Sequence, residues 1–176
     1  MRILIYGGTF NPVHTGHIRA VETASDYLHP QRIFFIPTSI PPHKELAKGS
    51  PGPEERLAML ELACEKLPGA SVLDMELRRE GLSYTADTLR SLKERFPKDE
   101  LIFLMGTDML MSFLTWYEPE TILACASLGV FAREKGREAE IEAAAERLRR
   151  AYNARVRVID GEPVTVSSTE LRAALP

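Results

Sequence analysis

The sequence has very little cysteine. Only Cys64 and Cys125 occur among its 176 residues, far apart and without a CxxC pair or a cluster of histidine and cysteine. Disulfide scaffolds and zinc ribbons need more cysteines at closer spacing, so both are excluded. We expect two reduced cysteines buried among apolar side chains.

Long apolar runs are also missing. No stretch approaches 18 consecutive apolar residues, and the N-terminal MRILIYGGTF leads directly into a strand and turn. A transmembrane helix needs about 20 apolar residues, and a secretory signal has a charged region and a cleavage site. The sequence therefore predicts a cytoplasmic protein with no membrane partner.

There is no excess of positive charge. The chain has 22 Lys and Arg against 25 Asp and Glu, which gives a formal net charge of −3. Proteins that bind nucleic acid in general carry a basic excess, because they neutralise many phosphates. We expect no nucleic-acid partner, and any bound polyanion should be small and held at a local site.

What the sequence does contain is typical of one folded domain, spanning residues 1–176. Hydrophobic residues make up 44% and charged residues 27%, and a chain of this length can bury a substantial core. Short apolar runs alternate with helical segments, which predicts an α/β fold: a Rossmann-like, doubly wound parallel sheet with helices on both faces. The expected strands are 2–6, 32–37, 71–75, 101–105, 127–131 and 156–159; the expected helices are 16–28, 53–66, 85–96, 119–125, 137–152 and 168–175.

Two segments interrupt this alternation. Residues 38–52 have no periodicity and contain two adjacent prolines, and a loop of this length in a compact domain is usually functional or disordered. Residues 106–116 follow a strand directly. Their first members should lie at the carboxyl edge of the sheet, where open α/β sheets bind ligands.

The most informative segment is Gly7–His17, between the first strand and the first helix. Its spacing fits neither GxGxxG nor the P-loop. Gly7 and Gly8 directly after a strand nevertheless predict a sharp turn where a ligand can approach backbone N–H groups. The helix that begins near Thr15 directs its N-terminus at the same place, which is typical of an anion site.

His14 and His17 stand three residues apart at the start of that helix, so one bound group can reach both. Histidines there can donate hydrogen bonds to phosphate oxygens and, when protonated, offset charge on a transferring phosphoryl group. The alternative is a helix cap plus a surface histidine. A zinc site is disfavoured because no third ligand stands at a recognisable spacing.

The segment Val166–Arg172 reads VSSTELR. Ser167 with Glu170 three residues later is typical of a capping box that opens a helix. A capped helix N-terminus with hydroxyls and an arginine one turn later can also hold a triphosphate. Both interpretations stay open from the residues alone.

GGTFNPVHTGH resembles the GG[ST]F-x-P-x-H-x-G-H signature of the nucleotidyltransferases with a T/HxGH motif. Further segments resemble the bacterial nicotinate-nucleotide adenylyltransferases within that group: PTSIPPHK, SYTADTL, GTD, WY and VSSTELR. The resemblance spans Gly7 to Arg172 and implies an adenylyltransferase-type fold. It also implies transfer of AMP from MgATP to nicotinate mononucleotide, with Mg²⁺ entering with ATP and no metal ligand from side chains.

The resemblance implies a role for each matching residue. Catalysis would rest on His14, His17, Lys44 and Arg172. ATP would be bound by Gly7, Gly8, Thr9, Phe10, His17, Gly106, Asp108, Arg133, Ser167, Ser168, Thr169 and Arg172. Nicotinate mononucleotide would be bound by Thr9, His14, Lys44, Tyr84, Thr85, Trp116 and Tyr117. Arg56 also matches the family pattern, with no specific role, and Glu134 replaces the proline that usually follows Arg133.

Trp116 and Asp108 also have interpretations from the residues themselves. Trp116 lies next to Tyr117 in a polar segment, where an indole face could stack on a heterocycle, although a lone tryptophan is more often a core residue. The resemblance implies that it stacks on the pyridine ring, whose carboxylate is taken by backbone N–H groups near Thr85 and Tyr117. Asp108 could accept from a ribose hydroxyl or cap a helix, and the resemblance implies placement at the ATP ribose or metal.

Three other functions stay open. The chain could be a related adenylyltransferase or cytidylyltransferase with another phosphorylated acceptor, or a non-catalytic nucleotide-binding module. A metal-dependent hydrolase would need ligands that the sequence does not show. The sequence carries no signal for an oligomeric state.

Overall fold

The structure of the protein is a computed structural model that describes residues 1–38, 49, 51–132 and 134–159. Six of the predicted site residues lie outside the described residues, as does the helix expected at 168–175 and most of the loop expected at 38–52. These six are Lys44, Arg133, Ser167, Ser168, Thr169 and Arg172.

A six-stranded sheet forms the centre of the molecule. Its strands pair in the order β3-β2-β1-β4-β5-β6, and every pair is parallel. This is the doubly wound order, so the predicted fold class is confirmed. The strands are β1 (Arg2–Gly8), β2 (Arg32–Pro37), β3 (Ala70–Val72), β4 (Glu100–Gly106), β5 (Ser127–Phe131) and β6 (Val156–Val158).

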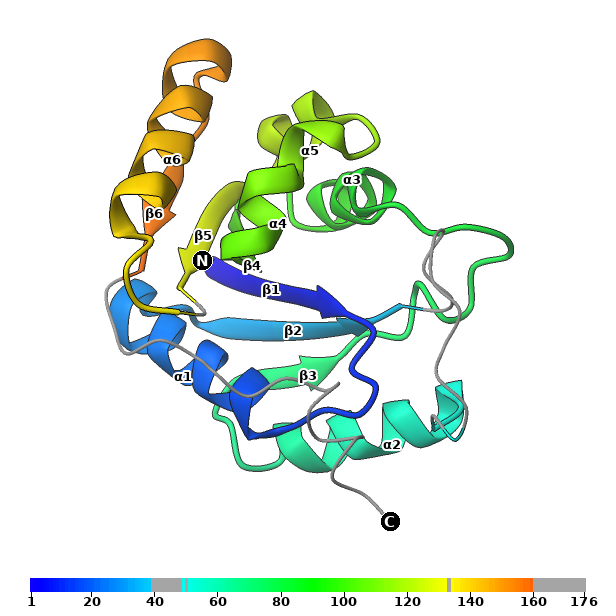
Figure 1. Cartoon of the computed structure of the whole chain (residues 1–176). Helices are drawn as coiled ribbons and strands as arrows, with labels where there is room; N and C mark the ends of the chain where they lie inside the picture. The colour runs from blue at the N-terminus through cyan, green and yellow to red at the C-terminus, as the bar shows by residue number, and fades with distance from the viewer. Residues whose placement is uncertain (39–48, 50, 133, 160–176) are drawn as a thin grey trace.

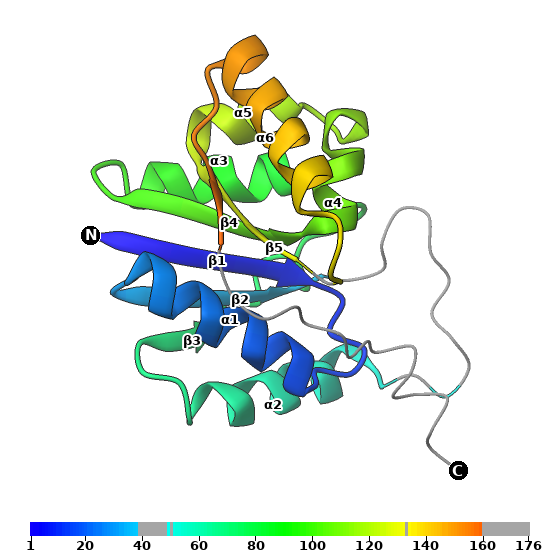
Figure 2. The ribbon, with the colours of Figure 1, turned by 60° about the vertical axis from the view of Figure 1, so that its left-hand side comes forward.

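Helices cover both faces of the sheet. Two of them, α1 (Thr15–Leu28) and α2 (Pro53–Cys64), lie on one face, and the others lie on the opposite face (Figures 1 and 2). The opposite face carries α3 (Thr85–Arg95), α4 (Thr107–Ser112), a 3₁₀ turn (Phe113–Thr115), α5 (Pro119–Cys125) and α6 (Glu138–Tyr152).

The central strand β1 contributes to both cores. Ile3 and Ile5 pack in the core beneath α3 to α6, while Leu4 and Tyr6 pack in the core beneath α1 and α2. All four are buried, because successive side chains of a strand point to opposite faces and both faces are covered. This explains why the strands read as continuous apolar runs.

The chain reverses its direction of winding between β1 and β4, which are hydrogen-bonded neighbours. From β1 the chain builds outward through β2 and β3, then returns to add β4, β5 and β6 on the other side. In such sheets ligands bind at this switch point, outside the carboxyl ends of the strands. Gly8 and Gly106 end the two strands there.

Some predicted elements differ from the structure. Residues 107–112 form α4, which the sequence does not signal because the helix is six residues long and has no side-chain cap. The strand β3 ends at Val72, since the chain turns at Asp74, whose carbonyl accepts from the N–H of Arg78 at 3.1 Å. Cys64 is buried as expected, but Cys125 is half-buried; both thiols are free. Among the described residues, no helix is long and apolar enough to cross a membrane.

Candidate active site

The glycine pair lies within β1, which runs to Gly8 in extended conformation. The expectation that these glycines make the sharp turn is wrong. Phe10 makes it, with a left-handed φ of 47°. The Phe10 ring is buried. Its centroid lies 5.5 Å from the ring centroid of Tyr6 and 4.9 Å from that of His17. This packing compensates for a backbone conformation that is uncommon outside glycine.

The predicted histidine pair lies at the N-terminus of α1. His14 is the N-cap residue: its Nδ1 accepts from the backbone N–H of Gly16 at 3.0 Å, and Nδ1 of His17 accepts from the backbone N–H of His14 at 3.1 Å. The two rings stack with centroids 3.8 Å apart. The pair therefore forms a reciprocal capping box.

The cap uses the Nδ1 atom of each histidine. Because both Nδ1 atoms accept hydrogen bonds, the proton of each neutral ring resides on Nε2. Each Nε2 is thus a hydrogen-bond donor at the N-terminus of a 14-residue helix, where the macrodipole favours anions. The helix-cap interpretation of the pair is therefore confirmed. Hydrogen bonding of the two histidines to phosphate oxygens stays a prediction.

Arg56 lies in the first turn of α2 and is 1% exposed. Its Nη1 donates to the backbone oxygens of Thr9, at 2.8 Å, and Thr38, at 2.7 Å. Thr38 in turn donates its N–H to the oxygen of Gly8 at 2.9 Å. Arg56 therefore ties the end of β1 to the end of β2, and burial lowers the pKa of its guanidinium.

The residues that follow β4 lie on the other side of the switch point from those that follow β1. Gly106 is the N-cap of α4, and Asp108 stands in its first turn with an 81% exposed side chain. The Asp108 carboxylate pairs with Arg137 at 3.2 Å. Arg137 also pairs with Glu134, which precedes α6, and with Glu140 in the first turn of α6. It was not among the residues predicted for the site.

Four predicted acceptor-binding residues line one cavity of about 370 Å³: Tyr84, Thr85, Trp116 and Tyr117. Trp116 is half-buried, its ring centroid lies 5.3 Å from that of Phe113, and its Nε1 donates to Ser112 Oγ at 3.3 Å. It thus packs against the core and also lines the cavity. Tyr84 is the N-cap of α3, so the first N–H groups of that helix begin at Thr85 and need partners outside the helix.

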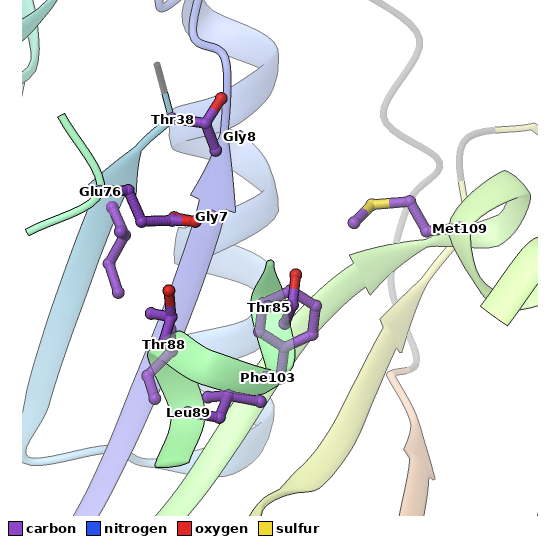
Figure 3. A pocket seen from close by; sticks show the side chains of 11 residues that line it. Gly7, Gly8, Thr38, Glu76, Thr85, Thr88, Leu89, Phe103 and Met109 are labelled. Carbon is purple, nitrogen blue, oxygen red and sulfur yellow. The ribbon is translucent and has the colours of Figure 1, made fainter. Parts of the chain in front are cut away.

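A second cavity, of about 140 Å³, runs from Thr85 to the glycine pair (Figure 3). Gly7, Gly8, Glu76 and Thr88 are among the residues that line it. Thr85 belongs to both cavities. The larger cavity alone is within the size range of small-molecule sites, about 300–1,000 Å³.

Sequence reasoning missed Glu76 as well. Its side chain is 5% exposed, and burial raises the pKa of the carboxyl to about 7, opposed by Arg79 and by a hydrogen bond with Thr88. One signal was available: Glu76 stands between Met75 and Leu77 at the end of an apolar run, where a charged residue is unusual.

The structure thus gathers twelve predicted residues at the carboxyl edge of β1 and β4 and at the neighbouring start of α3. These are Gly7, Gly8, Thr9, Phe10, His14, His17, Gly106, Asp108, Tyr84, Thr85, Trp116 and Tyr117. Within the described part of the chain, no group of three or more His, Cys, Asp or Glu side chains could hold a metal ion.

Comparison with known proteins identifies the family. A family model described as cytidylyltransferase-like matches residues 5–174. A Geobacter sulfurreducens protein named "Probable nicotinate-nucleotide adenylyltransferase" is 42% identical over 144 residues, which is 82% of this chain and 66% of that protein. A Citrifermentans bemidjiense protein of the same name is 36% identical over 189 aligned positions, covering 99% of this chain and 87% of that protein.

Solved structures show the same fold. The Plasmodium falciparum nicotinic acid mononucleotide adenylyltransferase complexed with NaAD superposes with a TM-score of 0.79 at 19% identity, covering 98% of this chain and 82% of that one. The same enzyme complexed with APC gives a TM-score of 0.76. Fold, site and sequence similarity agree, and the chain belongs to the nicotinate-nucleotide adenylyltransferases of the cytidylyltransferase-like family.

Proposed function

We propose that this enzyme transfers the adenylyl group of MgATP to the phosphate of nicotinate mononucleotide and releases pyrophosphate, as a step of NAD biosynthesis. The observation that carries the proposal is a pair of cavities at the switch point that share the lining residue Thr85. One is the aromatic cavity of Trp116 and Tyr117, and the other is lined by the glycine pair at the end of β1. The paired histidines cap the helix that follows.

In the proposed reaction, a phosphate oxygen of the mononucleotide attacks the α-phosphorus of ATP in line. The new P–O bond forms as the bond to the bridging oxygen breaks, and pyrophosphate leaves with that electron pair. No side chain forms a covalent intermediate, so catalysis consists of positioning and charge stabilisation. His14 and His17 would donate from Nε2 to the transferring and leaving phosphates, with Lys44 and Arg172 as further cationic groups.

ATP would occupy the part of the switch point near α1 and β4. Backbone groups of residues 7–10 and Gly106 would contact it, Asp108 would accept from its ribose, and Arg133, Ser167, Ser168, Thr169 and Arg172 would hold its phosphates. Asp108 is exposed and already oriented by Arg137, which suits a carboxylate that accepts from a hydroxyl of an entering ligand.

The acceptor would place its pyridine ring against Trp116. The first N–H groups of α3 beside Tyr84 and Thr85 line the same cavity and are suited to a carboxylate, because a helix N-terminus favours negative charge. The amide of a nicotinamide would present NH₂ hydrogens to some of these donors. This contrast would favour nicotinate over nicotinamide.

Magnesium would enter with ATP. The described residues offer no carboxylate cluster, which fits an ion held chiefly by phosphate oxygens and water. When bound, it would offset the charge of the triphosphate. The side chains would then bind and orient the two nucleotides.

A panel of substrates tests the proposal. Pyrophosphate release should be fastest with ATP and nicotinate mononucleotide, and slow when CTP replaces ATP or when phosphopantetheine replaces the mononucleotide. Faster release with either replacement would assign the chain to another transferase of the family. ATP binding without pyrophosphate release from any acceptor would make it a nucleotide-binding module.

A further inference from the structure

The smaller cavity contains a carboxyl group for which neither the family motifs nor the proposed reaction gives a role. Glu76 lines this cavity together with Gly7, Gly8 and Thr38. In Figure 3 its side chain extends toward Gly7 at the end of β1. A carboxyl group that is 5% exposed in such a cavity calls for hydrogen-bond donors, because burying it otherwise costs several kcal/mol.

The described residues supply part of what this carboxyl needs. The side chains of Arg79 and Thr88 both lower the pKa of this carboxyl against the effect of burial, and Arg79 donates from Nη1 to Thr88 Oγ1 at 3.3 Å. A carboxylate has about four acceptor positions, so these two neighbours leave positions for further donors. The pKa of Glu76 is raised to about 7 because these neighbours offset only part of the effect of burial. Raised carboxyl pKa values of this kind are common at ligand-binding sites.

The neighbours of Glu76 indicate which part of a ligand would complete it. The aromatic cavity is lined by Trp116, and the smaller cavity that contains Glu76 is lined by the glycine pair. A mononucleotide has its base, its sugar and its phosphate in that order. Thr85 lines both cavities. A mononucleotide with its ring at Trp116 and its phosphate at the glycine pair would therefore place its sugar in the smaller cavity, which Glu76 lines.

We propose that Glu76 binds the ribose of the acceptor mononucleotide, through hydrogen bonds between its carboxyl group and the sugar hydroxyls. The inference rests on the proposed function. Apolar contacts from Leu89 and Phe103, which line the same cavity, suit the carbon face of a sugar ring. A carboxyl group pairs with hydroxyls in either protonation state, because the ionised form accepts and the neutral form both accepts and donates.

Comparing two substrates in three enzyme variants tests the contact between Glu76 and the ribose. The kcat/KM is measured at saturating MgATP for nicotinate mononucleotide and for its 2′,3′-dideoxy analogue, in the wild type, Glu76→Gln and Glu76→Ala. The wild type should prefer the natural sugar by about tenfold or more, the usual effect of one or two hydrogen bonds to a buried carboxyl. Glu76→Ala should reduce that preference to less than about threefold, with Glu76→Gln between the two.

The sugar preference is the ratio of two kcat/KM values measured on one enzyme preparation. A misfolded fraction lowers both values equally, so it does not change the ratio. Glu80→Gln is the matched control, because Glu80 is exposed in the same segment; it should keep the wild-type preference. Should neither Glu76 variant fold, carbon-13 NMR of the wild-type Glu76 carboxyl replaces the cycle. Its signal should move on titration with the mononucleotide, and much less with the dideoxy analogue.

The outcomes separate this inference from the proposed function. An equal sugar preference in the wild type and Glu76→Ala, or an equal NMR response to both ligands, overturns the ribose contact while leaving the adenylyl transfer standing. A wild type that releases no pyrophosphate with nicotinate mononucleotide overturns the proposed function, and the ribose contact with it.

Discussion

Arg56 Nη1 donates a hydrogen bond to the backbone oxygen of Thr9, with a donor–acceptor distance of 2.8 Å. The same atom donates to Thr38, so one buried guanidinium fixes the positions at which β1 and β2 lead out of the sheet. Thr9 is a predicted contact for both substrates. A residue 47 positions away in the sequence thereby holds in place the turn that follows β1.

Replacing Arg56 should impair both stability and activity. Arg56→Met removes two hydrogen bonds to backbone oxygens, and the loss should exceed the relief from burying a charge. We expect a decrease of about 2 kcal/mol in the free energy of unfolding in urea, and a fall of about tenfold in kcat. Arg78→Met, at an exposed arginine, should change stability by less than about 0.5 kcal/mol. Wild-type stability and kcat in Arg56→Met would show that the turn does not depend on this residue.

His17→Ala should lower kcat by about 100- to 1000-fold, the usual effect of removing a donor that stabilises transition-state charge. The loss of the cap should cost about 1 kcal/mol of stability, which leaves the protein folded. His29→Asn serves as the control, because His29 ends α1 at its opposite terminus in a left-handed conformation that asparagine tolerates. The catalytic role would be refuted by a His17→Ala variant with kcat near that of the wild type.

Trp116→Ala should raise the KM for nicotinate mononucleotide far more than the KM for ATP, because its indole lines the acceptor cavity. Trp116→Phe retains an aromatic face but loses the hydrogen bond to Ser112, and should lie between Ala and wild type. Steady-state kinetics with each substrate varied in turn measures both constants. Equal effects on the two KM values would assign Trp116 to the core alone.

Glu76 should make stability depend on pH. Burial raises its pKa from 4.5 to about 7, with Arg79 and Thr88 opposing the shift. The folded state therefore holds this proton at pH values where the unfolded chain has released it. The stability of the wild type relative to Glu76→Gln should be highest below pH 4.5, fall as the pH rises toward 7, and stay constant above that.

At 1.36 kcal/mol per pKa unit, the change over this range should be about 3 kcal/mol. Urea unfolding of both proteins between pH 4 and pH 8 measures it. Glu80→Gln is the control substitution, since Glu80 is exposed in the same segment. A difference between wild type and Glu76→Gln that does not change with pH would mean that Glu76 titrates as an ordinary carboxyl.

The sequence predicted those features of the fold that local pattern determines. Apolar runs such as Leu101–Met105 form strands because both faces of the sheet are covered. The helix α4 could not be predicted, since six residues with no side-chain cap leave no periodic signal. The turn at Phe10 was assigned to the glycines, because a positive φ outside glycine depends on packing against residues distant in the sequence.

The residues of the candidate site also fall into those that local sequence pattern predicts and those that it does not. His14 and His17 could be predicted because their spacing places both on the first turn of one helix. Arg56 and Arg137 could not be given roles, because each acts through a contact with a segment far away in the sequence. Glu76 could not be given one because its place in a cavity beside the glycine pair follows only from the fold. Long-range contacts of this kind leave little trace in a single sequence.

The most direct test of the account is pyrophosphate release at saturating MgATP, compared between nicotinate mononucleotide and nicotinamide mononucleotide. We expect one pyrophosphate and one nicotinate adenine dinucleotide per turnover with nicotinate mononucleotide, and a much lower kcat/KM with nicotinamide mononucleotide. An equal or higher kcat/KM with nicotinamide mononucleotide would contradict the acceptor site described around Thr85 and Trp116, and no release with either would contradict the proposed reaction.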